Sequence, residues 1–299
     1  MKYWITEGKL DSDEDLRMFS YEQLLIIKRG VEQSLDVSVY AKTCYSAEQM
    51  EEIFLGLEHG VDVRKYADCS FNAKQMEQIR LGLDDELDVT AYQNPHYHSK
   101  QMEQIRLGLL YDLDVSWYAR LYFTAEQMGQ IRAGLQNNVD VSFYNDDAYS
   151  AYHMQIIRVA LEQDYSPEYL LNAELDDSQL VEIFKGLECG VDVSKYASSI
   201  YNGKQMNELR TGLEEGLDIE LYSDSGLNAT VMGLMRRAMK EKCFHVEYNP
   251  DRFNNGQLEE IYQGFLAKVD AEKYARPDLS PDAMREFRLS LMKDQILAR

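Results

Sequence analysis

The fold is decided by a stretch at residues 75–92, QMEQIRLGLDDELDVTAY, which returns at residues 205–222 as QMNELRTGLEEGLDIELY. The same pattern recurs throughout with a period of 26 residues, without an insertion or a deletion. A fixed period of this length indicates a tandem-repeat architecture. The copies are numbered repeats 1–11, and the places within each copy are positions 1–26. The repeats begin at Phe19, Tyr45, Phe71, Tyr97, Phe123, Tyr149, Leu175, Tyr201, Leu227, Phe253 and Leu279.

Each repeat carries the signals that start an α-helix at position 3. Position 2 is Ser, Asn, Thr or Asp in ten of the eleven repeats, with His98 as the exception, and these residues cap helix N-termini. Position 5 is Gln in eight repeats, which completes a capping box, and the apolar residues at positions 1 and 6 form a hydrophobic staple. Positions 6, 9 and 13 then supply one apolar stripe, as Met76, Ile79 and Leu83 do in repeat 3.

Position 12, in the middle of this helix, is always small. It is Gly in eight repeats and Ala160, Ala238 or Ser290 in the others. Gly inside a helix costs roughly 1 kcal/mol relative to Ala, so its recurrence needs a reason. The pattern predicts that the backbone of another helix lies close to position 12.

The second half of each repeat predicts a turn and a shorter helix. Gly60, Gly190, Gly216 and Asn138 occupy position 16, and Leu or Val follows, which is typical of a Schellman C-cap. Asp at position 18 can cap a helix of one or two turns that ends near the recurrent Tyr of position 22. One such unit cannot bury its apolar stripe alone, whereas stacked neighbours can. The sequence therefore predicts an all-α fold, an α-solenoid of about eleven helix–turn–helix repeats.

We expect the solenoid to be one continuous domain over residues 19–299, preceded by an N-terminal capping segment at residues 1–18. Two repeats depart from the pattern after their first helix. Repeat 6 has Tyr165–Pro167 where most repeats have an apolar-Asp-apolar run, and repeat 9 has Cys243–His245. The curvature of the solenoid is expected to change at these places.

The chain is strongly acidic, with a net charge of −21 and a pI of about 4.6. Such a surface disfavours direct binding of nucleic acid or anionic lipid and favours a protein partner with a basic surface. No stretch approaches the length of an apolar membrane span, and no signal peptide is recognisable. The four cysteines, Cys44, Cys69, Cys189 and Cys243, show no CxxC spacing, so the sequence predicts reduced thiols in a cytoplasmic protein.

No motif for catalysis, metal binding or cofactor binding is present. The chain contains no HExxH, G-x-S-x-G, Walker or G-x-G-x-x-G pattern. The sequence therefore predicts a protein that is not an enzyme, without catalytic residues, metal site or cofactor. Arg or Lys at position 10 in eight repeats could grip phosphates. Position 10 lies at the edge of the apolar stripe, however, which favours a buried stem and an ion pair, for instance with the Asp at position 18.

Aromatic residues at position 21 are the first candidates for binding a partner. This position varies between repeats, which indicates that it faces outward, and it holds Trp117, Phe143 and Tyr169 in three successive repeats. Tyr111 and Tyr122 lie near them in the sequence. A row of exposed aromatic residues is typical of a contact patch. The alternative is that the short helix buries both of its faces there.

Acids at the outer positions 7, 8, 14 and 15 are the second candidates, among them Glu51, Glu52, Asp84 and Asp85. A charged outer face is usually a solvated face. Spread along a rod, the same carboxylates could also imitate the charge of a nucleic-acid backbone.

The motif in residues 75–92 and 205–222 resembles tandem 26-residue α-helical repeats of uncharacterised proteins from gut Firmicutes and their mobile elements. The likeness covers residues 19–299 and implies a bacterial or phage-related cytoplasmic protein, without catalytic residues to transfer.

Two functions compete. The chain is either a scaffold that binds a protein partner along the solenoid, or an acidic nucleic-acid mimic that inhibits a DNA- or RNA-binding protein such as a phage-defence nuclease.

Overall fold

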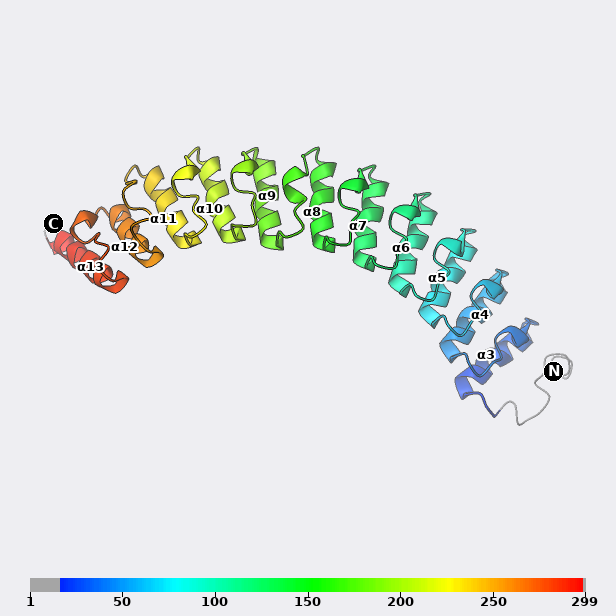
Figure 1. The fold of residues 1–299 in the computed structure, drawn as a ribbon. Helices are drawn as coiled ribbons and strands as arrows, with labels where there is room; N and C mark the ends of the chain where they lie inside the picture. The colour runs from blue at the N-terminus through cyan, green and yellow to red at the C-terminus, as the bar shows by residue number, and fades with distance from the viewer. Residues whose placement is uncertain (1–16, 298–299) are drawn as a thin grey trace. The chain divides into compact units, whose positions relative to one another are not determined.

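The computed structural model describes residues 17–297, and the regular structure in this part is entirely helical. It contains eleven α-helices and nine one-turn 3₁₀ helices (Figure 1). The α-helices are α3 (Tyr21–Glu32), α4 (Ala47–His59), α5 (Ala73–Asp84), α6 (Ser99–Leu110), α7 (Ala125–Gln136), α8 (Ala151–Glu162), α9 (Asp177–Cys189), α10 (Gly203–Glu214), α11 (Ala229–Lys240), α12 (Asn255–Leu266) and α13 (Pro281–Leu297). The 3₁₀ helices are η1 (Val37–Val39), η2 (Val63–Lys65), η3 (Val89–Ala91), η4 (Val115–Trp117), η5 (Val141–Phe143), η6 (Glu168–Leu170), η7 (Val193–Lys195), η8 (Ile219–Leu221) and η9 (Ala271–Lys273).

The predicted all-α architecture of helix–turn–helix repeats is confirmed, and the second helix is a single 3₁₀ turn. Two compact units divide the chain, residues 1–158 and 159–299, with the boundary inside α8. Within the first unit each helix from α3 to α7 packs against the next, and within the second unit the same holds from α9 to α13. Residues 1–16 of the expected capping segment lie outside the described residues. The single continuous domain stays a prediction.

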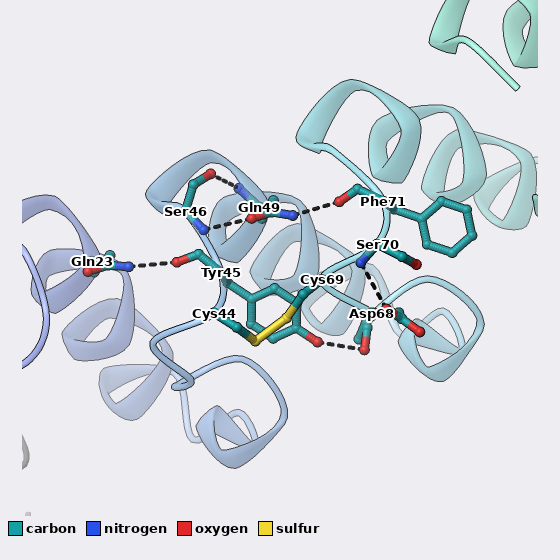
Figure 2. Close-up of a disulfide and its surroundings, with 10 residues drawn as sticks. Gln23, Cys44, Tyr45, Ser46, Gln49, Asp68, Cys69, Ser70 and Phe71 are labelled. Carbon is teal, nitrogen blue, oxygen red and sulfur yellow. Dashed lines mark hydrogen bonds between the residues drawn. A yellow bond between two sulfur atoms is a disulfide. The ribbon is translucent and has the colours of Figure 1, made fainter. Parts of the chain in front are cut away.

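The Gln at position 5 links each repeat to the next. In α4, the Ser46 N–H donates to Gln49 Oε1 at 2.7 Å and the Gln49 N–H donates to Ser46 Oγ at 3.2 Å, which is the predicted capping box. The remaining amide group, Gln49 Nε2, donates to the carbonyl of Phe71 at the start of the following repeat (Figure 2). The same bond is made by Gln23, Gln49, Gln75, Gln101, Gln127, Gln179, Gln205 and Gln257. This second role of the glutamine is not visible in the local capping pattern.

The small residue at position 12 makes room for a tyrosine and not for a helix backbone, so that prediction is wrong. A Cβ atom on Gly82 would lie 1.9 Å from the hydroxyl of Tyr92, the position-22 residue of the same repeat. Tyr92 is fully buried, and its hydroxyl donates to the carbonyl of Gln78 at 3.2 Å. All eight repeats with Gly at position 12 have this arrangement. In repeat 6 the pair becomes Ala160 and Leu170.

The turn after each α-helix has the predicted Schellman geometry. Position 16 is left-handed in repeats 1–10, with φ between 55° and 77°. In repeat 3 the Leu87 N–H donates to the carbonyl of Gly82 at 2.8 Å, and the Glu86 N–H donates to that of Leu83 at 3.1 Å. These bonds satisfy the last carbonyl groups of the helix and reverse the chain, so that the 3₁₀ turn packs back on its own α-helix.

The prediction of four reduced thiols is wrong for one pair. Cys44 and Cys69 form a disulfide, with their Cα atoms 6.0 Å apart (Figure 2). Cys44 is position 26 of repeat 1 and Cys69 is position 25 of repeat 2, and stacking of the two repeats brings their loops together. Cys189 and Cys243 are free. Disulfides persist mainly in oxidising compartments, so the cytoplasmic location has lost one of its arguments and stays a prediction.

Candidate interaction surfaces

The basic residues at position 10 hold neighbouring repeats together. Arg80 is buried, and its Nε donates to Glu52 Oε2 of the preceding repeat at 2.8 Å. The same bond to position 8 of the preceding repeat is made by Arg106 to Gln78, Arg132 to Gln104, Arg158 to Gln130, Arg210 to Glu182, Arg236 to Glu208 and Arg288 to Glu260. The structural interpretation of this ladder is confirmed. Its partner is position 8, however, and the Asp at position 18 instead caps the 3₁₀ helix, as Asp88 does by accepting from the Thr90 N–H.

Two equivalent glutamates of this ladder differ in their surroundings. Burial raises the pKa of Glu52, and the carboxylates of Glu77 and Glu51 act in the same direction, against the hydrogen bond from Arg80. Burial also opposes ionisation of Glu182, but hydrogen bonds from a lysine, an arginine and an asparagine outweigh it and lower the pKa of that group. The carboxylates of Glu51 and Glu77 thus add negative charge near Glu52, whereas Glu182 has three donors around it.

The candidate aromatic residues differ in exposure and in place. Trp117 on η4 and Phe143 on η5 occupy the same position of consecutive repeats and are 36% and 41% exposed. Tyr111 forms the C-cap of α6, Tyr122 lies in the loop before α7, and each is 57% exposed. In repeats 4 and 5 the 3₁₀ turn therefore leaves position 21 open to solvent. Tyr169 lies on η6 in the second unit and is half-buried.

Repeat 4 also exposes two aliphatic side chains that sequence reasoning missed. Leu110 at the end of α6 is 46% exposed and Leu121 in the following loop is 50% exposed. Together with Tyr111, Trp117 and Tyr122, this gives repeat 4 five exposed large apolar side chains. A signal existed in the sequence, because positions 14 and 15 are both acidic in repeats 3 and 8 and are Leu-Tyr in repeat 4.

The four candidate acids are all engaged with basic groups of the chain. Glu51 pairs with Arg29 at 2.8 Å, and Glu52 pairs with Arg80 at 2.8 Å. Asp84 lies 3.0 Å from both Arg80 and His59, and Asp85 lies 3.5 Å from Arg106. Each of these carboxylates thus bridges helices or stabilises a neighbouring arginine.

The surface between neighbouring α-helices is hollowed into open grooves. One groove of about 700 Å³ runs between α5 and α6 and is lined among others by Lys74, Glu77, Lys100 and Glu103. Within residues 17–297, no His, Cys, Asp and Glu side chains gather in a group that could hold a metal ion. No helix in this part of the chain is long and apolar enough to cross a membrane.

Comparisons with protein-family models, with curated proteins and with solved structures found no match. The resemblance to repeat proteins of gut Firmicutes therefore stays a prediction. Function has to be argued from the residues of this chain alone.

Proposed function

We propose that this chain is a non-enzymatic scaffold that binds a protein partner along the solenoid surface. The observation that supports the proposal is the concentration of exposed apolar side chains in repeat 4, continued by Phe143 in repeat 5. Trp117 and Phe143 stand on one-turn helices that are anchored by buried neighbours at positions 19 and 22. Aromatic residues held in this way dominate the energetics of many protein interfaces.

The charge of the chain favours a partner with a basic surface. The resemblance to repeat proteins of gut Firmicutes implies a bacterial or phage-related cytoplasm as the place of this contact. The nucleic-acid mimic is the second hypothesis and draws on the same charge. It is less favoured because Glu51, Glu52, Asp84 and Asp85 are already paired within the chain. A mimic requires carboxylates that are free to meet the basic side chains of the enzyme it inhibits.

Affinity capture of bacterial lysate proteins on the full chain, with quantification of each captured protein, tests the proposal. A specific partner should be retained at high salt and lost when Trp117→Ala and Phe143→Ala are combined. The matched control is Leu221→Ala, at position 21 of repeat 8, where the side chain is 42% exposed. Capture that disappears at high salt and ignores the aromatic substitutions would contradict the scaffold and favour the mimic, because exposed charges are screened by salt.

A further inference from the structure

A contact between repeats 1 and 2 shows how position 11 meets position 7 of the next repeat. Arg29 on α3 places Nη1 2.8 Å from Glu51 Oε2 on α4, and the pair is partly exposed. Here a cation at position 11 neutralises the carboxylate that the following repeat presents.

Repeats 2 and 3 have leucine at position 11 instead of a cation. Repeats 3 and 4, which follow them, still have glutamate at position 7. Leu55 precedes Glu77, and Leu81 precedes Glu103, in the register in which Arg29 precedes Glu51. Because the repeats follow one register, each leucine takes the place that Arg29 holds relative to Glu51. In the described part of the chain no hydrogen bond or ion pair reaches Glu77 or Glu103. Lys74 and Lys100, at position 4 of repeats 3 and 4, line the same groove but make no ion pair with them.

The leucines continue as an apolar row across α4, α5 and α6. Leu55, Leu81 and Leu107 at position 11 are half-buried, and the exposed Leu110 and Tyr111 lie one turn further along α6. Carboxylates border the row at position 7, with Glu77 and Glu103, and at position 14, with Glu58 and Asp84. The name leucine–glutamate face is used below for Leu55, Leu81, Leu107, Glu77 and Glu103.

We propose that the leucine–glutamate face binds a basic amphipathic helix of the protein partner, an inference that rests on the proposed scaffold function. An apolar row bordered by the unpaired carboxylates of Glu77 and Glu103 complements a helix with an apolar stripe and flanking Arg or Lys. The partner's basic groups take the place that Arg29 holds against Glu51.

The spacing of the repeats restricts the sequence of that helix. Packed helices lie roughly 9 Å apart, so Leu55, Leu81 and Leu107 recur at about this interval across the face. A helix rises 1.5 Å per residue, so about six to seven of its residues span one interval. The bound helix should therefore carry apolar residues at about every seventh place, with basic residues beside them.

Binding of a synthetic helical peptide to the full chain, followed by fluorescence anisotropy, tests this inference. The probe has about 21 residues, with Leu at every seventh place and Arg on the flanks, and its matched control has Glu in place of Arg. Wild-type protein should bind only the Arg peptide. Combining Glu77→Gln with Glu103→Gln should weaken binding about tenfold and reduce its salt dependence. Combining Leu81→Ser with Leu107→Ser should weaken binding about tenfold without changing the salt dependence.

Glu259→Gln is the matched control for the charge, because Glu259 takes position 7 in repeat 10, where Arg237 precedes it at position 11. It should bind as wild type does, and circular dichroism checks that each variant keeps its helices. Equal binding by wild type and both double variants, or binding of the Glu peptide, would overturn the inference. A different variant tests the scaffold function on its own. Combining Trp117→Ala with Phe143→Ala should abolish capture of the natural partner but leave binding of the peptide intact.

Discussion

The close fit of Gly82 against Tyr92 predicts that Gly82→Ala destabilises the protein, whereas helix propensity alone predicts that it stabilises the protein. In Gly82→Ala the new Cβ atom would lie 1.9 Å from the tyrosine hydroxyl and 3.1 Å from Val89 Cγ1. The contact with the hydroxyl cannot persist, so the tyrosine ring has to move out of its buried site. Its hydrogen bond to the carbonyl of Gln78 is then lost.

The terms of this substitution can be compared. Replacing Gly by Ala inside a helix should stabilise it by about 1 kcal/mol. Overpacking of a well-filled core costs about 1–3 kcal/mol, and loss of a buried hydrogen bond costs about 1 kcal/mol. We therefore expect Gly82→Ala to lower the free energy of unfolding by about 2 kcal/mol. Gly129→Ala on α7 is the matched control, since its Cβ atom would meet nothing closer than Gln104 Oε1 at 3.4 Å, and it should stabilise the protein.

Repeat 6 supplies the compensating substitution. There, positions 12 and 22 are Ala160 and Leu170, and both are fully buried. The double variant Gly82→Ala with Tyr92→Leu should therefore be more stable than the sum of its single effects by about 2 kcal/mol. Because a solenoid can lose individual repeats, the measurement should combine urea unfolding with hydrogen exchange of the α5 amides.

A stabilising or neutral Gly82→Ala would refute this reasoning, because helix propensity alone would then account for the result. Strict additivity in the double variant would show that the two residues do not interact. If instead Gly129→Ala were as damaging as Gly82→Ala, the loss would belong to glycine in general and not to the tyrosine.

Three further predictions concern charge and the disulfide register. Burial raises the pKa of Glu52, so ionisation of this carboxyl destabilises the folded state. Wild-type protein should therefore lose stability relative to Glu52→Gln as the pH rises through that pKa. The difference between the urea midpoints of the two proteins should be larger at neutral than at acidic pH. Alkylation of unfolded protein should label two thiols before reduction and four after it, and four labelled thiols before reduction would contradict the disulfide. Reduction of the Cys44–Cys69 bond should destabilise the first repeats by about 3 kcal/mol, because the closed loop restricts the unfolded chain. Ile200 and Ser225 stand in the same register as that pair, so a double cysteine variant at these positions should form a new disulfide on mild oxidation, and failure to cross-link would contradict equal stacking of repeats 7 and 8.

Local signals in the sequence predicted the helices. Contacts across the turn and contacts between repeats were not predicted. The capping box at Gln49 depends on residues three apart, so it can be read directly. The partner of Gly82 could not, because Tyr92 reaches it only after the Schellman turn reverses the chain. The disulfide could have been found by register, since Cys44 and Cys69 are one residue short of a full repeat apart.

Contacts within and between repeats explain the recurring residues but not all of the surface residues. The glutamine at position 5, the glycine at position 12 and the tyrosine at position 22 all have partners within the solenoid, so their recurrence needs no external ligand. Trp117 is 36% exposed, at a position where other repeats place different residues. Within residues 17–297, Glu77 and Glu103 lack the cation that Arg29 provides for Glu51. Burial of an apolar side chain or pairing of a carboxylate would stabilise the chain, and the equivalent repeats show that both were attainable. Departures of this kind fall together on repeats 3 and 4, and the proposed contact with another protein would use both the apolar surface and the unpaired carboxylates.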